Sequence, residues 1–464
     1  MTQLQVLRGM LNLDAVEPAG HTPASDSVPR PKSVPPPVGG VSPPQPARNS
    51  LCIGTEEGLV RAAVALPLDD LRTHAAILGG SGSGKSSLAL RLVEELLLGG
   101  VPVIMVDRKG DLASFLNVLR GTAVPKGARA ERQGKLQRGV DSVLYTPGEP
   151  RGRPLRIALL PEGLEGLRPD EREEEVRAGA DALGDVLEYK RSGKDQSFRT
   201  LLTQGLSVLA DATQAVTLEG LIHLLDDQDP AFLARIGRLD VKLCHRMVQD
   251  LETFRLSKSG LLDGPGDPLS IDALFGYDGS VASGKTRLSV LSTKGLRNAG
   301  EASFWLAQFL LQLGRWMNRR PSEKLQGVVF FDEADIYLPA MSQPATKAPM
   351  ENLLRRARAA GLGIVLGTQS PGDLDYKCRD NIKTWMVGRI REARALEKLR
   401  PLFSGSRMDV AAKLPSREAG QFFLLSGAEV TGFLAELPVR APEQLSEAQL
   451  VELARHGGGA KGVS

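Results

Sequence analysis

The sequence has few cysteines and histidines, and neither residue type is arranged as a ligand set. Its 464 residues include only Cys52, Cys244 and Cys378, without a Cys-x-x-Cys spacing, and five widely scattered histidines. This usage argues against a disulfide framework and a Cys/His metal centre, and it favours a reducing compartment. His74 is accordingly interpreted as a packing or edge residue and not as a catalyst.

Long apolar runs and an excess of one charge are missing as well. No segment approaches the ~20 apolar residues of a membrane-spanning helix, and the interrupted apolar pattern around Arg8 does not predict a signal peptide. We therefore expect a cytoplasmic protein without direct membrane insertion. The formal net charge of +3, from 58 Lys and Arg against 55 Asp and Glu, is too small to indicate a nucleic-acid partner by itself.

Residues 1–50 have the composition of a disordered segment. Ten prolines lie between positions 18 and 46, mixed with glycine, serine and other small residues, and this mixture cannot bury enough apolar surface to fold. Ahead of them, apolar residues at positions 4, 6, 7, 10 and 11 are compatible with one short amphipathic helix that docks on a protein partner. A frayed terminus is the alternative interpretation.

The pattern G-x-x-x-x-G-K-[S/T] occurs twice, and its first copy has the surroundings of a phosphate-binding loop. Apolar residues 75–78 before it have strand character, and residues 87–98 after it place apolar side chains at helical spacing up to Gly99 and Gly100. Backbone N–H groups of such a loop and the N-terminus of the following helix hold nucleotide phosphates. The predicted binding residues are Gly79, Gly80, Ser81, Gly82, Ser83, Gly84, Lys85, Ser86 and Ser87.

The second copy, at residues 279–286, lacks these surroundings. It follows a turn at residues 275–278 and leads into residues 287–292, which alternate like a strand, so no helix N-terminus faces a phosphate. We interpret it as a surface loop that matches the pattern by chance, and we expect one nucleotide per chain.

Strands alternate with helices from residue 51 onward, which predicts an α/β fold with a mostly parallel sheet and helices on both faces. The apolar strand at residues 101–106 ends in Asp107-Arg108-Lys109-Gly110-Asp111, and ligand-facing residues cluster at such carboxyl ends. Residues 161–264 are helical in character and are predicted to be an insertion that divides the core into residues 51–160 and 265–440. The tail, residues 441–464, contains a helix at 447–456 that begins with a capping box of Ser446 and Gln449.

An apolar strand at residues 327–331 ends in two carboxylates, Asp332 and Glu333. A nucleotide-hydrolysing site needs such a pair, because Asp332 and the Ser86 hydroxyl are oxygen ligands of the kind Mg²⁺ prefers. Glu333 is then placed to polarise the attacking water. The alternative is an acidic pair that only caps a strand end.

Polar residues after two further strands complete the candidate site. Gln369 follows the apolar segment 363–368 and is predicted to sense the γ-phosphate or position water, with a plain strand-terminal amide as the alternative. Arg356 and Arg358 lie at the end of a helix, where their positive charges interact favourably with the negative end of the helix dipole. One of them, or Arg389 or Arg391, is a candidate arginine finger that acts on the ATP of a neighbouring subunit.

A basic segment at residues 121–139 is the candidate DNA contact. It carries five basic residues against Glu131, in a stretch rich in glycine and alanine that predicts a flexible loop. Such a loop tracks phosphates without reading sequence, although a solvated surface loop is an equal interpretation, and no interleaved aromatics suggest base stacking. The basic residues are Lys126, Arg129, Arg132, Lys135 and Arg138.

Four segments in order carry a resemblance to a known family: GGSGSGKSS, VDRKGDL, VVFFDEAD and LLRRARAAGLGIVLGTQSPGDLD. Together they resemble the HerA/FtsK branch of P-loop ATPases, and most closely the HerA-like ATPase domain. The resemblance covers roughly residues 51–403. It implies a RecA-like core of the ASCE type, ATP and Mg²⁺ as cofactors, a homo-hexameric ring, and movement of double-stranded DNA through its pore. In such rings Lys85 and Ser86 bind phosphate and Mg²⁺, Asp332 and Glu333 serve metal and water, and Gln369 is the sensor.

The chain also departs from this pattern. HerA-type proteins carry a small β-barrel ahead of the P-loop, and here only the proline-rich linker is expected in that place. FtsK and conjugation coupling proteins share the core but are tethered by transmembrane helices. A motor that moves protein or nucleoprotein in a secretion or conjugation complex therefore remains an alternative. A nucleotide-gated assembly protein, docking through its N-terminal segment or C-terminal helix, is a second.

Overall fold

The structure is a computed structural model that describes residues 49–58, 61–121, 126–160, 164–212, 216–239, 241–262, 266–406, 408–427 and 429–456. The chain divides into two units, residues 1–44 and 45–464, and all described residues belong to the second. The predictions for the proline-rich segment and for a docking helix at its start lie outside the described residues.

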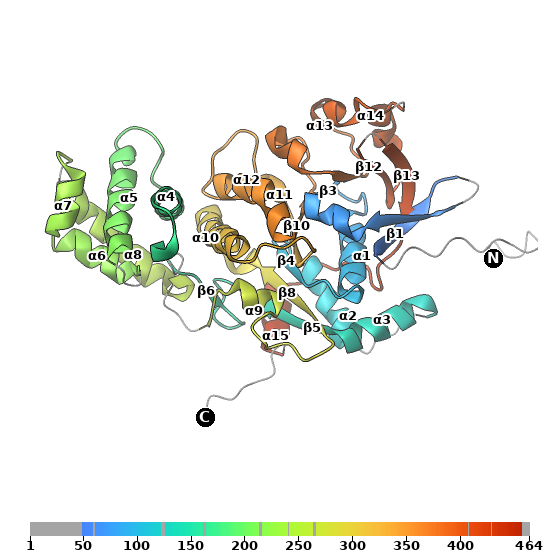
Figure 1. Ribbon diagram of the computed structural model, residues 1–464, viewed down its shortest axis with the longest axis horizontal. Helices are drawn as coiled ribbons and strands as arrows, with labels where there is room; N and C mark the ends of the chain where they lie inside the picture. Colours follow the sequence, from blue (N-terminus) through green and yellow to red (C-terminus); the bar gives the residue numbers. More distant parts are fainter. Residues whose placement is uncertain are drawn as a thin grey trace, which may run out of the picture. The chain divides into compact units, whose positions relative to one another are not determined.

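One mixed sheet of eleven strands organises the described part of the chain, in the order β2-β1-β13-β12-β11-β3-β10-β9-β4-β8-β5 (Figure 1). The strands from β11 to β5 run parallel, and the four at the other end are antiparallel. This confirms the predicted, mostly parallel fold. The strands are β1 (Ser50–Glu56), β2 (Ala63–Pro67), β3 (Ala75–Leu78), β4 (Val103–Asp107), β5 (Val140–Tyr145), β8 (Thr286–Ser292), β9 (Gly327–Phe331), β10 (Leu362–Thr368), β11 (Thr384–Val387), β12 (Gln421–Ser426) and β13 (Glu429–Ala435).

Helices cover both faces of the parallel strands, which is why every residue of β3, β4, β9 and β10 is buried. Ala75 and Ile77 of β3 pack into one core with α1, whereas Ala76 and Leu78 pack into the other with α10 and α12. The helices are α1 (Lys85–Leu98), α2 (Leu116–Arg120), α3 (Ala128–Gly139), α9 (Ile271–Phe275), α10 (Ala299–Arg319), α11 (Ala334–Tyr337), α12 (Lys347–Arg356), α13 (Ala393–Leu399), α14 (Val410–Lys413) and α15 (Glu447–Arg455).

Two strands, β1 and β2, precede β3 and the P-loop, so the expectation that only a proline-rich linker stands there is wrong. β1 pairs antiparallel with β2 and with β13, so the two ends of the described chain meet in the same sheet. Leu51 and Ile53 are buried in the core shared with α1. Sequence periodicity did not reveal this pairing, because the partner strand lies almost the whole chain away.

The region predicted as a helical insertion contains α4 (Pro169–Val186), α5 (Asp195–Asp211), α6 (Leu218–Asp226), α7 (Pro230–Ile236) and α8 (Lys242–Leu262). It is flanked by two short strands, β6 (Leu155–Arg156) and β7 (Asp267–Pro268), which pair with each other. The chain therefore leaves and re-enters the α/β core at one place. The insertion helices share a hydrophobic core with α10, including Trp305. The limits of the insertion as a domain, residues 161–264, stay a prediction.

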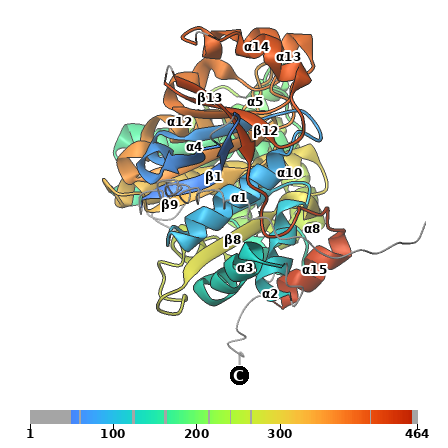
Figure 2. The same ribbon diagram turned by 90° about the vertical axis from the view of Figure 1, so that its right-hand side faces the viewer.

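The C-terminal helix begins where the capping box predicts, since Ser446 Oγ accepts from the N–H of Gln449 at 3.3 Å. Its apolar side packs inward, and Leu450, Val451 and Ala454 are buried. Arg120 of α2 donates to the carbonyl of Leu453 at 2.6 Å, so α15 lies beside α2 (Figure 2). The expectation that this helix docks on a protein partner is therefore not supported, because its apolar face is already used. None of the helices in the described ranges combines the length and apolar character of a membrane-spanning segment.

His74 is a packing residue, as predicted, and it ties β3 to its neighbours. Its Nδ1 accepts from the N–H of Ile364 at 3.2 Å, and its Nε2 lies 3.0 Å from the carbonyl of Leu354. Only 1% of the residue is exposed, and burial lowers the pKa of His74 to about 4. The ring is therefore neutral, with Nε2 as the donor.

We expect the His74 ring to stay neutral down to about pH 4 in the folded protein. Because the ordinary histidine pKa is about 6.5, its contribution to the free energy of unfolding is complete above that pH and falls by roughly 3 kcal/mol toward pH 4. Burial raises the pKa values of Glu94 and Asp107 to about 7, and these carboxyl groups contribute in the opposite sense. The titration of the His74 ring itself is therefore followed by NMR, and a His74→Gln variant assigns its signal. A midpoint between pH 6 and 7 would contradict the expectation.

Candidate nucleotide-binding site

The first P-loop copy connects β3 to α1 as predicted. Lys85 is the first residue of α1, and Gly84 before it has a φ of 92°, a left-handed conformation that suits glycine. A Cβ atom on Gly84 would also lie only 2.9 Å from the backbone nitrogen of Gly420. The Ser83 hydroxyl is buried and makes no hydrogen bond within the described residues. The second copy instead runs straight into β8, whose first residue is Thr286.

Lys85 of α1 meets Asp332, the residue that follows β9. Lys85 Nζ lies 2.5 Å from Asp332 Oδ1, and the two residues are 4% and 1% exposed. Burial raises the pKa of Asp332, while the positive charge of Lys85 lowers it. Because β9 is separated from β3 by β10 in the sheet, this contact brings together two motifs that are far apart in the sequence.

Glu333 has a left-handed backbone, with a φ of 54° and a ψ of 49°, which is unusual for a residue other than glycine. Such strain is typical of functional positions that the surrounding fold holds in place. Its Oε1 pairs with Lys109 Nζ at 2.6 Å. The sequence placed Lys109 at a ligand-facing strand end but did not indicate this partner.

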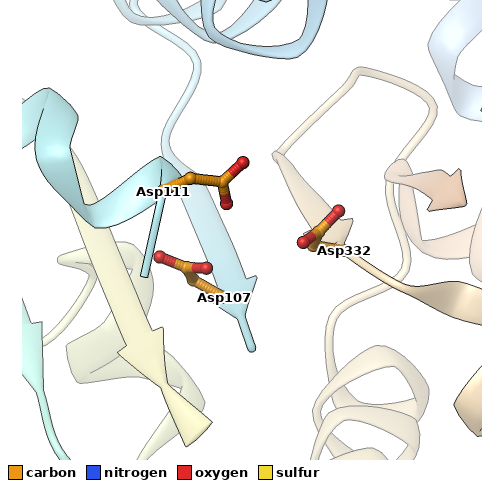
Figure 3. Close-up of side chains that lie close together, drawn as sticks. All are labelled: Asp107, Asp111 and Asp332. Atoms are coloured by element: carbon orange, nitrogen blue, oxygen red, sulfur yellow. The ribbon is translucent and has the colours of Figure 1, made fainter. Parts of the chain in front are cut away.

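Three aspartates lie close together beside the P-loop, and one of them contacts Ser86. Asp107 and Asp111 come from the end of β4 and the loop after it, and Asp332 directly follows β9 (Figure 3). One oxygen from each of the three carboxylates lies within 4.8 Å of the others. Ser86 Oγ donates to Asp111 Oδ2 at 2.7 Å. Asp111 was missed as a candidate ligand, although its position after the second apolar strand was a usable signal.

The oxygens of this cluster suit a hard cation. Asp107 is engaged by its own loop, because its two oxygens accept from the N–H groups of Gly110 and Ala113, both at 2.8 Å. Its burial, followed by the charge of Asp111, raises the pKa of Asp107 to about 7. Asp332 Oδ2 is buried and makes no hydrogen bond in the described part of the chain. Ser86, Asp111 and Asp332 together therefore fit the oxygen ligand set of Mg²⁺.

Gln369 follows β10, the strand that lies between β3 and β9. The N–H of Gly79 donates to the carbonyl of Thr368 at 3.3 Å, which ties the start of the P-loop to the end of β10. Gln369 itself is half-buried beside this junction. Its place is compatible with a sensor, and that role stays a prediction.

The four candidate arginines lie in different surroundings. Arg356 donates to Asn318 Oδ1 at 3.0 Å, and Arg356, Arg358 and Arg391 are exposed. Arg389 instead contacts the P-loop of its own chain, donating to the carbonyls of Ser81 and Gly82. A role in trans stays a prediction for each of these four arginines.

The basic segment is a helix for most of its length, so the predicted flexible loop is wrong. Residues 128–139 form α3, in which Gln133 and Leu136 are buried. Arg132 pairs internally with Glu436 and with Glu94, the latter at 3.5 Å, and Lys135 pairs with Glu131 at 2.8 Å. Arg132 is thus a structural residue. Lys126, Arg129 and Arg138 are exposed.

Comparisons with known proteins agree with this geometry. Residues 52–157 match the family model of the central domain of the helicase HerA. The matched residues include the P-loop, Asp107 and Asp111, whereas Asp332 and Glu333 lie outside them. No curated protein matches the chain by sequence.

Among solved structures, VirB4 of Thermoanaerobacter pseudethanolicus is 15% identical, with 84% of this chain and 96% of that chain covered and a TM-score of 0.58. The plasmid coupling protein TrwB in complex with ADP and Mg²⁺ is also 15% identical, with 84% and 90% covered and a TM-score of 0.53. TrwB with a non-hydrolysable ATP analogue is 15% identical, with 83% and 89% covered and a TM-score of 0.52. At these identities the likeness is one of fold. The match to the HerA central domain thus covers residues 52–157, and most of the chain shares the fold of VirB4 and TrwB.

Proposed function

We propose that this protein is an ATP-hydrolysing motor that acts on double-stranded DNA. The contact between Lys85 and Asp332, at 2.5 Å, carries the ATPase part, because it joins the phosphate-binding loop to the carboxylate strand in one buried site. The match to the HerA central domain supports DNA as the polymer. The assignment of DNA rests on this kinship, since fold alone does not fix a substrate.

Each residue of the site has a role in this proposal. Lys85 turns from Asp332 to the nucleotide phosphates, and the backbone N–H groups of the P-loop hold them. Ser86 and Asp332 hold Mg²⁺, with Asp111 beside them. Bound Mg²⁺ supplies positive charge that offsets the charge on the phosphates. Glu333 accepts a proton from the attacking water, which requires that it first leave Lys109.

The remaining assignments concern the assembly. Gln369 lies at the strand end between the P-loop and Glu333, where it would orient the water. An exposed arginine, Arg356, Arg358 or Arg391, would reach the ATP of the next subunit. This requires a ring, and a cytoplasmic homo-hexamer is the form that we propose.

A second candidate function is the movement of protein or nucleoprotein in a conjugation or secretion complex. The observation that favours it is the fold shared with VirB4 and with the bacterial conjugative coupling protein TrwB. The alternative of a nucleotide-gated assembly protein assumed docking through the N-terminal segment or the C-terminal helix. That helix, α15, packs against its own chain, so one of the two assumed docking elements is already in use.

The ATP turnover rate with and without linear double-stranded DNA separates these functions. At low salt we expect DNA to stimulate turnover severalfold, and we expect added salt to remove the stimulation because phosphate contacts release counterions. Arg138→Glu, in the last turn of α3, should weaken the stimulation. Arg319→Glu, an exposed arginine in the last turn of α10, is the matched control and should not.

The outcomes are distinguishable. Turnover that is indifferent to DNA at low salt would count against the DNA motor and favour the second candidate. Equal stimulation of the two variants would remove α3 from the DNA-contacting surface while leaving the motor intact. Absence of any turnover would overturn the ATPase itself.

A further inference from the structure

Arg389 lies beside the P-loop of its own chain because β11 runs parallel to β3. Val387 is in register with Leu78, and the hydrogen bonding continues beyond the two strands. The N–H of Gly388 donates to the carbonyl of Leu78 at 2.8 Å, and the N–H of Gly80 donates to the carbonyl of Arg389 at 2.9 Å. The backbone of Arg389 is therefore fixed against the first residues of the loop.

The Arg389 side chain also contacts the same loop. Its Nη2 donates to the carbonyl of Ser81 at 3.3 Å and to that of Gly82 at 3.2 Å. Gly82 has a φ of 69°, and a Cβ atom there would lie 3.3 Å from Nη2 of Arg389. The loop thus presents backbone carbonyls to the guanidinium of Arg389, which is half-buried as a residue.

The hydrogen bonds from Arg389 to these two carbonyls also fix the direction of the N–H groups in the same peptides. In a trans peptide the C=O and N–H point in opposite directions, so the N–H of Gly82 points away from Arg389. The carbonyl of Gly82 shares its peptide with the N–H of Ser83, which closes the turn on the carbonyl of Gly80 at 3.1 Å. A phosphate cradle needs its N–H groups directed inward, and ordering the loop in advance lowers the entropy lost on binding.

We propose that Arg389 is a positioning residue of the nucleotide site in cis, where its guanidinium braces the P-loop turn at residues 80–83 for a nucleoside polyphosphate. A guanidinium that is engaged at its own P-loop is not available to a neighbouring subunit, so Arg389 is not the arginine finger. The inference rests on the proposed function, since it assumes that this loop binds nucleotide. It adds a contact that the linear motif does not contain.

The test compares Arg389→Ala, Arg389→Lys and a control, Arg394→Ala, which removes an exposed arginine in the first turn of α13. Affinity for a fluorescent ADP is measured first. We expect Arg389→Ala to weaken binding by about tenfold or more, because two hydrogen bonds from a charged donor are lost. Arg389→Lys should recover part of the affinity, and Arg394→Ala should bind like the unmodified chain.

Steady-state turnover then separates bracing from catalysis in trans. A brace lost in cis raises the KM for ATP with little change in kcat, whereas a lost finger lowers kcat. Mixing with Lys85→Ala subunits adds a second criterion, since a finger from one subunit serves a neighbour and a brace does not. Native ADP affinity in Arg389→Ala, or a loss of kcat at unchanged KM, would overturn this inference but leave the proposed function standing. If the unmodified chain binds no ADP, the proposed function falls with it.

Should Arg389→Ala not fold, Arg389→Lys decides the question. Lysine keeps the charge but is a compact donor that cannot span both carbonyls as a planar guanidinium does. We expect it to fold and to bind ADP less tightly than the unmodified chain. Native affinity and native KM in Arg389→Lys would count against the brace.

Discussion

Replacing Glu333 by glutamine is expected to slow ATP hydrolysis by about 10²- to 10⁴-fold while ATP binding stays close to native. Glutamine has nearly the same shape but cannot accept a proton from the attacking water. Glu333 does not belong to the P-loop, so the contacts that hold the phosphates remain. Lys109 loses the partner that it contacts at 2.6 Å, but it is partly exposed and remains hydrated. Single-turnover hydrolysis and equilibrium binding of ATP measure the two properties separately.

Glu323→Gln is the control for this experiment, because Glu323 is exposed in the loop before β9 and is not part of the site. It should hydrolyse ATP like the unmodified chain. Full activity in Glu333→Gln would remove Glu333 as the catalytic base. Loss of binding together with turnover would instead point to damage of the strained backbone at this position.

Lys85→Ala is expected to reduce ATP affinity by about 100-fold, the upper part of the range for losing hydrogen bonds to a charged group. The matched change, Lys285→Ala, should leave affinity unchanged, because Lys285 is exposed in a turn ahead of β8 and no helix follows it. The two variants remove the same residue from the same sequence pattern in different structures. Titration with a fluorescent ATP analogue measures both.

This pair tests the prediction of one nucleotide per chain. Affinity retained in Lys85→Ala, or lost in Lys285→Ala, would show that the pattern at residues 279–286 binds nucleotide after all. Removing Lys85 also leaves the buried Asp332 without its ion-pair partner. A thermal unfolding midpoint measured without nucleotide shows whether Lys85→Ala still folds, and a binding loss in a folded variant is then assigned to the lysine itself.

The sequence predicted the local surroundings of the motifs correctly, because these surroundings depend on neighbours along the chain. The first P-loop was separable from the second because a strand and a helix must flank it, and both leave apolar patterns within about twenty residues. Asp332 and Glu333 were visible for the same reason, as a carboxylate pair after a buried strand. The mostly parallel sheet followed from the alternation of strands and helices.

The errors arose where the deciding contact is distant. Five basic residues with glycine and alanine suggested a loop, yet Gln133 and Leu136 pack as one side of a helix, and Arg132 is paired with Glu94 and Glu436. The capping box of the C-terminal helix was read correctly from Ser446 and Gln449. The use of its apolar face against the chain itself was not, because periodicity reports an apolar face without naming what covers it.

By itself the sequence indicated the resemblance to the HerA/FtsK branch, the fold class and the two motifs proposed to hold a nucleotide, because each is encoded in residues close together along the chain. Only the tertiary structure decided that Ser86 donates to Asp111, that Glu333 pairs with Lys109, and that Arg389 donates to the carbonyls of its own P-loop. These contacts form where the carboxyl ends of β3, β4, β9 and β11 meet at one edge of the sheet. Strand order sets which ends are neighbours, and the packing of distant segments sets strand order, so no local pattern contains it.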